Sequence, residues 1–300
     1  MSRQLSDFSK GASTGAVQAG GVKLSDLARA IRTVPVAPEV LPKLQSKLQD
    51  LDTDSSDLAA LIKLDAGLAS SVLRMSNSVY YARASEVTSL DEAVSLIGYQ
   101  ETMRIVTRCS FSTVMKNSLE QYGLQGDHLW RQAVLTAFSM EVLCATVEAD
   151  SSIGYIAGLL HAVGMVAIND YLNRRGNPPQ AIPARSNADF AEWERQTIGY
   201  HHGQVGGALM RGWQLPAIVA SAAERQFEAD VADDEPIVHC LLPLAITLAH
   251  RVIRTSEGEE VDDVIFDPVR MQRAGLDGEQ IAKAAASIAV HWEKAKGTLA

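Results

Sequence analysis

Apolar residues recur every three or four positions through most of this chain, and this helical spacing restricts its fold more than any other feature. Glycine and proline interrupt the pattern at intervals and mark helix ends, as at Gly98, Gly199, Gly212 and Pro216. No run alternates polar and apolar residues as a half-buried strand requires, and no fixed-period repeat is present. The sequence therefore predicts an all-α protein built from many helices.

The first half of the chain contains several signals for where helices begin and end. Ser89 and Glu92 form a capping box that starts a helix ending at Gly98, after which Tyr99, Met103 and Val106 mark another. Asp65 and Asp127 are expected to be N-caps of two further helices. The apolar faces expected here contain Val40, Leu41, Leu44, Leu48 and Leu51 behind Pro38; Leu58, Leu61 and Ile62; Leu68, Val72 and Met75; and Trp130, Val134, Phe138 and Val142.

The second half of the chain continues the same pattern. One helix is expected to carry Ile153, Ile156, Leu160, Val163 and Ala167 on a single face. Gly154 and Gly158 in this helix are expected to let a neighbouring helix approach closely. Further helices are predicted at about residues 188–198, 202–212, 217–228, 237–255 and 278–296.

Composition limits the cellular setting. Residues 1–22 are rich in Ser, Gly and Ala and are interpreted as a flexible tail without an apolar signal-peptide core. The three cysteines, Cys109, Cys144 and Cys240, are widely spaced and suggest neither a disulfide framework nor a thiolate zinc site. No run approaches the roughly 18 consecutive apolar residues of a membrane helix. A cytoplasmic protein with no membrane association is therefore expected.

The charge of the chain argues against nucleic-acid binding. A net charge of -9 repels a phosphate backbone, and the densest basic run is only Arg174-Arg175. The short helices expected within residues 65–115 resemble helix-turn-helix proteins, but they offer only Arg104 and Arg108 for contact with DNA. No DNA partner is therefore expected.

Several sequence blocks occur in the order found in HDOD domains, the HD-related output domains of bacterial signalling proteins. The blocks are Val36-Ala37-Pro38-Glu39-Val40-Leu41, Leu64-Asp65-Ala66-Gly67-Leu68-Ala69, Arg74-Met75-Ser76-Asn77-Ser78-Val79-Tyr80-Tyr81, Ser89-Leu90-Asp91-Glu92-Ala93-Val94, Leu129-Trp130-Arg131, Ala157-Gly158-Leu159-Leu160-His161, and Gly199-Tyr200-His201-His202-Gly203-Gln204-Val205-Gly206 before Trp213-Gln214-Leu215-Pro216. The chain thus resembles an HDOD protein. The resemblance implies a multi-helix HD-like domain over residues 23–230, with residues 231–300 as a C-terminal helical extension packed on it.

The resemblance also indicates where a metal centre would lie in catalytic HD proteins, which use a first His, a His-Asp pair and a later Asp. In this chain the first position is Gln132, the pair is His161 and Ala162, and the last position falls near His250. Alanine has no oxygen to offer, and a lone imidazole with an amide would hold a divalent cation poorly. We therefore expect no catalytic residue, no cofactor and no metal at these positions.

A displaced histidine site is the alternative, because His128, His161, His202 and His250 could converge and bind zinc. The adjacent pair His201-His202 is more simply interpreted as a helix N-terminus after Gly199, since neighbouring helical residues point about 100° apart. No Gly-x-Ser-x-Gly elbow is present, and no other catalytic constellation stands out.

A second group of residues could line either a pocket or a partner surface. Asn77, Tyr80 and Tyr81 suit both of these roles, and they suit equally well a structural role between short helices.

The function predicted from these observations is that of a non-catalytic bacterial signalling module that acts through protein-protein interaction and has a protein partner. The first alternative is a metal-dependent phosphohydrolase acting on a nucleotide or cyclic dinucleotide. The second is an effector that binds a cyclic dinucleotide without hydrolysing it, for which Arg104, Arg108 or Arg131 would have to contact phosphate.

Overall fold

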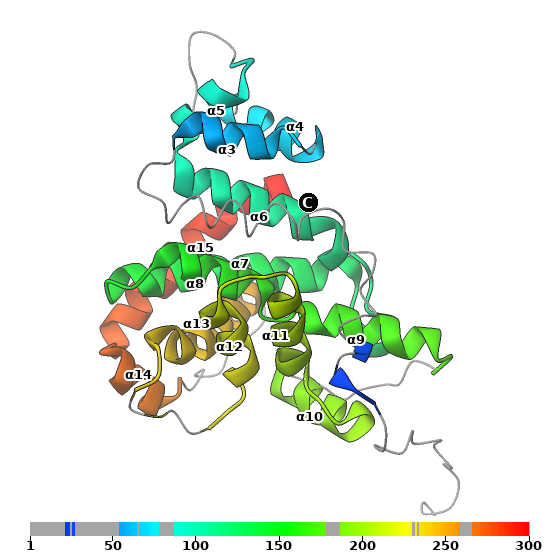
Figure 1. The fold of residues 1–300 in the computed structure, drawn as a ribbon. Helices are drawn as coiled ribbons and strands as arrows, with labels where there is room; N and C mark the ends of the chain where they lie inside the picture. The colour runs from blue at the N-terminus through cyan, green and yellow to red at the C-terminus, as the bar shows by residue number, and fades with distance from the viewer. Residues whose placement is uncertain are drawn as a thin grey trace, which may run out of the picture.

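Helices make up the regular structure of the described part of the chain (Figure 1). The computed structural model describes residues 22–24, 26–27, 54–64, 66–77, 87–177, 187–229, 232, 234–258 and 266–299. The main helices are α3 (Ser55–Ile62), α4 (Ala66–Ser76), α5 (Leu90–Ile97), α6 (Tyr99–Met115), α7 (Gly126–Thr146), α8 (Ser151–Leu160), α9 (Val163–Arg174), α10 (Asn187–Ile198), α11 (His202–Gly212), α12 (Ala217–Arg225), α13 (Ile237–Ser256), α14 (Pro268–Ala274) and α15 (Gly278–Leu299), with a 3-10 turn at η2 (Glu120–Tyr122). The all-α prediction is confirmed.

Several predictions concern residues that fall outside the described ranges. These are the tail before Val22, the helix behind Pro38, the cap at Asp65, and Tyr80 and Tyr81. Asn77 is described, and its side chain donates to the carbonyls of Leu73 and Val87 and accepts from the Val87 N–H at 2.8 Å. The structure therefore gives Asn77 a structural role that joins the end of α4 to the segment before α5.

Capping side chains begin several of the helices, and the one at Ser89 was predicted from the sequence. Ser89 accepts a hydrogen bond from the Glu92 N–H at the start of α5, and Gly98 ends that helix with a φ of 84°. Asp54, Asp150 and Asp267 cap α3, α8 and α14 in the same way. The predicted cap at Asp127 is wrong: the N-cap of α7 is Gln125, two residues earlier, and Asp127 lies in the first turn, where its charge suits the helix dipole.

The single helix expected from Ile153 to Ala167 is in fact two helices. α8 ends at Leu160, and α9 begins at Val163 after a turn at His161 and Ala162. The apolar spacing continues unbroken across this turn, so periodicity alone cannot detect it. The turn directs α9 against α11, where a methyl group added at Gly164 would collide with the His202 carbonyl oxygen.

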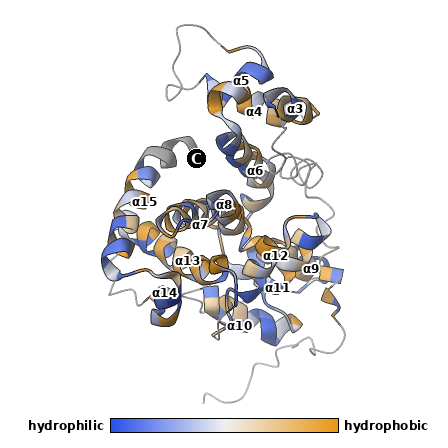
Figure 2. Cartoon of the chain, turned by 60° about the vertical axis from the view of Figure 1, so that its left-hand side comes forward, coloured by the Kyte–Doolittle hydropathy of each residue, from blue (hydrophilic) through white to orange (hydrophobic). Residues whose placement is uncertain are grey.

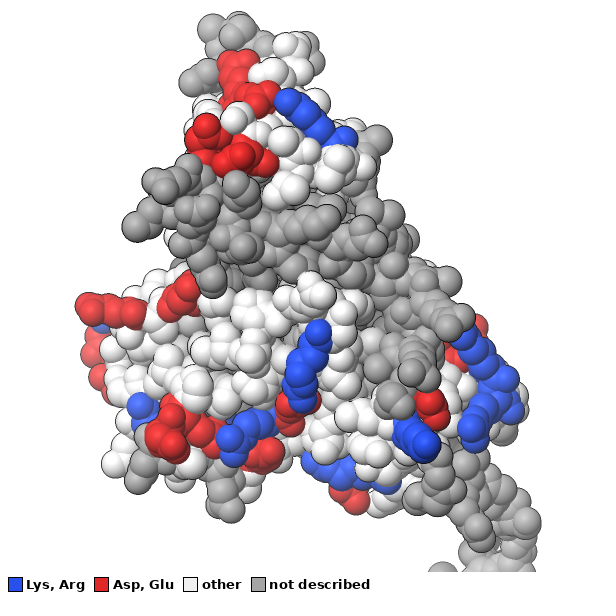
Figure 3. All heavy atoms as spheres, in the orientation of Figure 1, with Lys and Arg blue, Asp and Glu red and all other residues white. Residues whose placement is uncertain are grey.

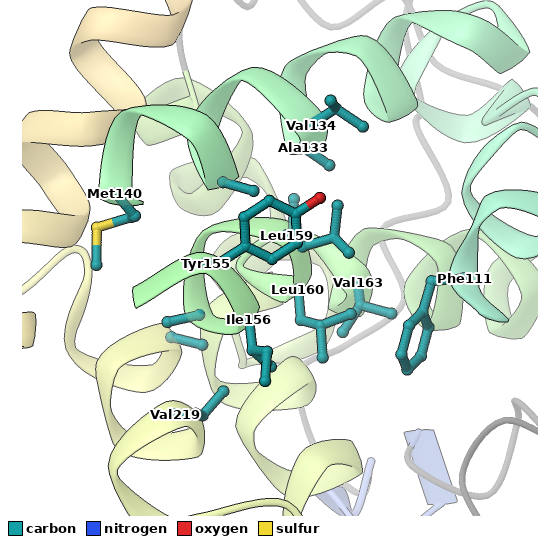
Figure 4. Packing of buried hydrophobic residues seen from close by; sticks show 14 of the residues in the cluster. Phe111, Ala133, Val134, Met140, Tyr155, Ile156, Leu159, Leu160, Val163 and Val219 are labelled. Carbon is teal, nitrogen blue, oxygen red and sulfur yellow. The ribbon is translucent and has the colours of Figure 1, made fainter. Parts of the chain in front are cut away.

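The core is built around α7 and α8. α8, α13 and α15 pack against α7, while α11 packs against both α9 and α12. In Figure 2 hydrophobic residues gather where α7, α8 and α13 meet. Figure 4 shows Tyr155, Ile156, Leu159 and Leu160 of α8 filling the space between α7 and α12.

The segments at the two ends of the chain join this core differently. α13 contributes twelve buried residues, so residues beyond 230 help to complete the core, although the domain boundary at 230 stays a prediction. α14 was not predicted. At the other end, α3, α4 and α5 pack on one another, and α4 and α5 join the rest through α6.

Two stretches are apolar and long enough to cross a bilayer by length and composition. They are Ser151–Arg174, which comprises α8 and α9, and Ile237–Ser256, which is α13. In these stretches 83% and 67% of the apolar window is buried inside the fold. Such burial is what core helices of this size show.

Gly158 allows α8 to approach α7 closely, as the sequence indicated. A methyl group at Gly158 would lie 2.7 Å from both the Ala137 Cα and the Thr136 carbonyl oxygen. We expect Gly158→Ala to lower the free energy of unfolding by roughly 1–3 kcal/mol, because two backbones must separate. Urea unfolding followed by circular dichroism measures this change.

Gly212→Ala is the matched control, since nothing lies within 4 Å of the added methyl group at this helical position. It should leave stability unchanged or raise it by up to about 1 kcal/mol. Equal effects of the two substitutions would show that the α7–α8 contact is not as tight as described.

Candidate functional site

The positions that correspond to a metal centre lie where α7, α8 and α13 meet, and two of them bind each other directly. Gln132 on α7 and His250 on α13 are joined by a hydrogen bond of 2.8 Å between their Nε2 atoms. An amide nitrogen can only donate, so His250 Nε2 is the acceptor. The imidazole lone pair that would bind a cation is therefore already used.

His161 lies nearby at the end of α8 and is completely buried. Its Nδ1 is 2.7 Å from the Gly158 carbonyl oxygen, so Nδ1 carries the proton and donates it to that bond. Burial lowers the pKa of His161 to about 3; the bond to Gly158 opposes this effect, and His202 and His250 add to it. His161 is therefore a neutral imidazole, and its Nε2 has no hydrogen-bond partner among the described residues.

His202, at the start of α11, is held by a buried carboxylate. Glu194 of α10 accepts hydrogen bonds from the Tyr122 hydroxyl at 2.7 Å, from the His202 N–H at 2.6 Å and from His202 Nδ1 at 2.9 Å. Burial, followed by the neighbouring charge of Glu194, raises the pKa of Tyr122 well above its ordinary value. The Phe227 and His202 rings are nearly perpendicular, with their centroids 5.0 Å apart.

Glu194 was not singled out from the sequence, although a signal exists. It lies four residues after Phe190 and four before Ile198, so it falls on the buried face of α10. A carboxylate on an apolar helix face must find internal partners, since burying a bare charge is costly. Those partners, Tyr122 and His202, come from distant segments, and the sequence does not reveal them.

His201 has the helix-capping role that the sequence predicted. Its Nδ1 accepts from the Gln204 N–H at 3.3 Å, and Gln204 Oε1 accepts from the His201 N–H at 3.1 Å, which completes a capping box. Burial first, and then the charges of His202 and Arg195, lower the pKa of His201 to about 3. A neutral imidazole is the form that can accept at a helix N-terminus.

The displaced histidine site is not found in the part of the chain that the structure describes. There, no three His, Cys, Asp or Glu side chains are arranged to hold a metal ion. Burial, followed by the nearby charges of His128 and Arg254, lowers the pKa of His250 to about 4. The alternative in which His128, His161, His202 and His250 converge on zinc is therefore not supported among the described residues.

The donor atoms present do not fit the divalent cation of catalytic HD proteins. Ala162 is completely buried and has no side-chain oxygen. Gln132 and His250 bind each other, and the one buried carboxylate in this region, Glu194, is bonded to Tyr122 and His202. A hard divalent ion needs carboxylate oxygens with free lone pairs, and the described side chains offer none here.

The arginines considered for phosphate binding do not form a pocket. Arg104 is paired with Glu101 at 2.8 Å and also with Glu141, and Arg131 is paired with Glu257 at 3.1 Å while lying over the Trp292 ring. On the face shown in Figure 3, basic and acidic side chains are interspersed. A groove of about 480 Å³ between α13 and α15 has Arg251, Trp292 and Glu293 in its lining, and none of the three candidate arginines.

The buried histidines make stability depend on pH. In the unfolded chain an imidazole binds a proton near its ordinary pKa of 6.5, whereas folded His161 does so only near pH 3. The unfolded state therefore binds more protons in this window, and stability is complete above about pH 6.5 and falls as pH is lowered towards 3. We expect His161→Gln to reduce the slope of unfolding free energy against pH by about 1.4 kcal/mol per pH unit in the middle of that window.

Urea unfolding at several pH values between about 7 and 4.5 measures this slope. His291→Gln is the control, because it replaces an imidazole that lies exposed on α15. Equal slopes for the wild type and His161→Gln would contradict the neutral buried state of His161.

Comparison with known proteins agrees with this architecture. Residues 34–229 match the family model of the HDOD domain. An uncharacterized protein of Treponema pallidum (strain Nichols) is 25% identical over 251 residues, which cover 81% of this chain and 47% of the relative. The chain thus spans about half the length of that curated relative.

Solved structures with the same fold cover nearly the whole chain. An HDOD domain protein of unknown function from Geobacter sulfurreducens has a TM-score of 0.64 at 20% identity, over 92% of this chain and 95% of the other. A Marinobacter aquaeolei VT8 chain with the provisional name signal transduction protein has a TM-score of 0.68 at 19% identity, over 93% of this chain and 61% of the other. A Shewanella amazonensis SB2B chain with the provisional name phosphohydrolase has a TM-score of 0.62 at 18% identity, over 90% of this chain and 94% of the other. Because the family model covers well over half of the sequence, the chain belongs to the HDOD family.

Proposed function

We propose that this protein is a non-catalytic regulatory module of a bacterial signalling pathway, which acts in the cytoplasm by binding another protein. The observation that carries the proposal is the direct hydrogen bond between Gln132 and His250. It joins two of the positions at which an HD hydrolase would hold its cation. The provisional name of the Marinobacter chain, signal transduction protein, agrees with such a role.

Recognition would use helix faces that the core leaves exposed. α3, α4 and α5 form a small group of helices, and α4 and α5 contact α6, which connects the group to the rest of the fold. Leu64, just after α3, has 69% of its surface exposed. Val290 on α15, far from Leu64 in the sequence, is 55% exposed. Large apolar side chains in water are common at sites that bind proteins, though single ones also occur elsewhere.

Metal-dependent hydrolysis is the first alternative, and the provisional name of the Shewanella chain would favour it. It would require a water molecule activated by a cation, for which this site offers no free carboxylate among the described side chains. Binding of a cyclic dinucleotide without hydrolysis is the second alternative. It would require Arg104 or Arg131 to leave its carboxylate partner before contacting phosphate.

Metal content tests the proposal directly. The untagged wild type, purified without chelator and analysed by elemental mass spectrometry, should contain almost no zinc, iron or manganese. The variant Gln132→His/Ala162→Asp/His250→Asp restores the ligand types of the HD centre and should gain about one Mn²⁺ per chain. Gln132→His/His250→Asp, which lacks the aspartate at 162, is the matched control and should bind much more weakly. Stoichiometric metal in the wild type would return hydrolysis to first place.

Partner binding needs its own measurement. A photo-crosslinking amino acid at Leu64 should give a discrete adduct in cells, and the purified partner should then bind the wild type in calorimetry. The same label at Glu148, which is exposed at the turn between α7 and α8, is the control. Tight binding of a cyclic dinucleotide in calorimetry, with no protein adduct, would support the second alternative instead.

A further inference from the structure

A serine, a histidine and a glutamate lie in line where α12 meets α13, away from the positions already described. Ser221 Oγ on α12 is 2.9 Å from His239 Nε2 on α13. His239 Nδ1 is in turn 3.1 Å from Glu235 Oε2, four residues earlier and just before α13. Both distances are within hydrogen-bond reach, which is the geometric requirement for a nucleophile, its base and the acid that orients the base.

Glu235 is held in place as a carboxylate. Its oxygens accept from the Arg225 guanidinium at 2.6 Å and from the Ala232 N–H at 3.3 Å. Burial tends to raise the pKa of Glu235, but these bonds and the contact with His239 lower it on balance. An ionised carboxylate can only accept, so Nδ1 of His239 must carry a proton.

This tautomer places the imidazole lone pair on Nε2, facing Ser221. In the neutral state of His239 the serine hydroxyl donates to Nε2, as a general base requires. When His239 is protonated, the hydroxyl has a second acceptor in the Ile218 carbonyl oxygen at 3.1 Å. Ser221 thus has an acceptor in both states, and the proton can move without leaving any group unpaired.

The surroundings fix the base and leave the serine residue partly in contact with solvent. His239 is only 5% exposed, and its carbonyl accepts from the buried Arg270 at 2.9 Å. Ser221 is half-buried, so this residue reaches the surface of the fold. The hydrogen-bonded chain therefore runs from a buried base to a residue at the surface.

We propose that Ser221, His239 and Glu235 form a Ser-His-Glu triad that makes Ser221 an acyl-accepting nucleophile towards activated carboxylic esters and thioesters. Attack forms a bond from Oγ to the carbonyl carbon while the hydroxyl proton moves to His239 Nε2. The bond to the alcohol or thiol then breaks, and the leaving group takes that proton. The products are acyl-Ser221 and the free alcohol or thiol. The proposal is independent of Gln132, His161 and His250.

Acylation of Ser221 would also change the contact between α12 and α13. The ester oxygen no longer donates to His239, so the contact between α12 and α13 loses its hydrogen bond. Ser221 is therefore a site at which covalent modification would change the surface formed by these two helices.

The test compares two serines in the same wild-type molecule. The full chain is treated with p-nitrophenyl acetate, and acetylated peptides are quantified by mass spectrometry over time. Ser112 is the internal control, because it is also half-buried in a helix and its Oγ donates to a carbonyl three residues earlier, yet it has no histidine partner. Ser221 should acetylate about 100-fold faster than Ser112, the scale of general-base assistance.

Variants then assign the roles. Ser221→Ala should abolish the modified peptide, while Ser112→Ala should leave the Ser221 rate unchanged. His239→Gln should lower the Ser221 rate about 100-fold, and Glu235→Gln should lower it as well, each with an unaltered circular dichroism spectrum. Equal rates for Ser221 and Ser112 in the wild type, or a His239→Gln rate equal to that of the wild type, would overturn the proposal without needing any unstable variant.

Discussion

The close approach of α8 to its neighbours is the constraint on which the rest of the structure depends. Gly158 brings α8 against α7 at Ala137, and Gly164, just beyond the turn at Ala162, brings α9 against α11 at His202. Every residue from Gly154 to Ala162 is buried as a result. His161 therefore sits where water does not reach, and its partners must come from the protein. This accounts for its bond to Gly158 and for its neutral state.

Around Gln132 and His250, burial favours hydrogen bonds between uncharged groups, because charged groups cost more free energy to remove from water. Gln132 and His250 form a hydrogen bond between two uncharged groups, which needs no counter-ion when it is removed from water. The buried carboxylate of Glu194 is stabilised by two side-chain donors and one backbone donor. A cluster of ionised metal ligands in the same space would repel one another unless a cation were bound. The residues present avoid this dependence, which supports the proposed role as a module that folds without a metal.

Sequence reasoning predicted most helices because apolar spacing and caps are local, and it failed where a long-range contact decides the outcome. The bounds of α10, α11, α13 and α15 agree with the predicted ranges to within a few residues. The turn at His161 and Ala162 was missed because the apolar spacing runs through it, and α14 because its seven residues give too short a pattern. Gln132 and His250 were identified because they lie at positions that the HDOD resemblance indicates. Glu194 and Ser221 belong to none of the motifs that carry this resemblance, and their partners, 8 to 72 residues away, are set by the tertiary fold.

The two polar clusters differ in one physical respect that separates their proposed roles. At the Gln132–His250 pair the partly exposed imidazole accepts from a buried amide N–H, and an amide nitrogen is not a nucleophile. At Ser221 the buried imidazole faces the hydroxyl of a partly exposed residue, and that oxygen becomes a nucleophile as its proton moves to the imidazole. Reactivity requires this kind of proton donor as well as alignment. The same kind of histidine hydrogen bond thus stabilises the core at one place, and at the other it leaves a group that can change covalently.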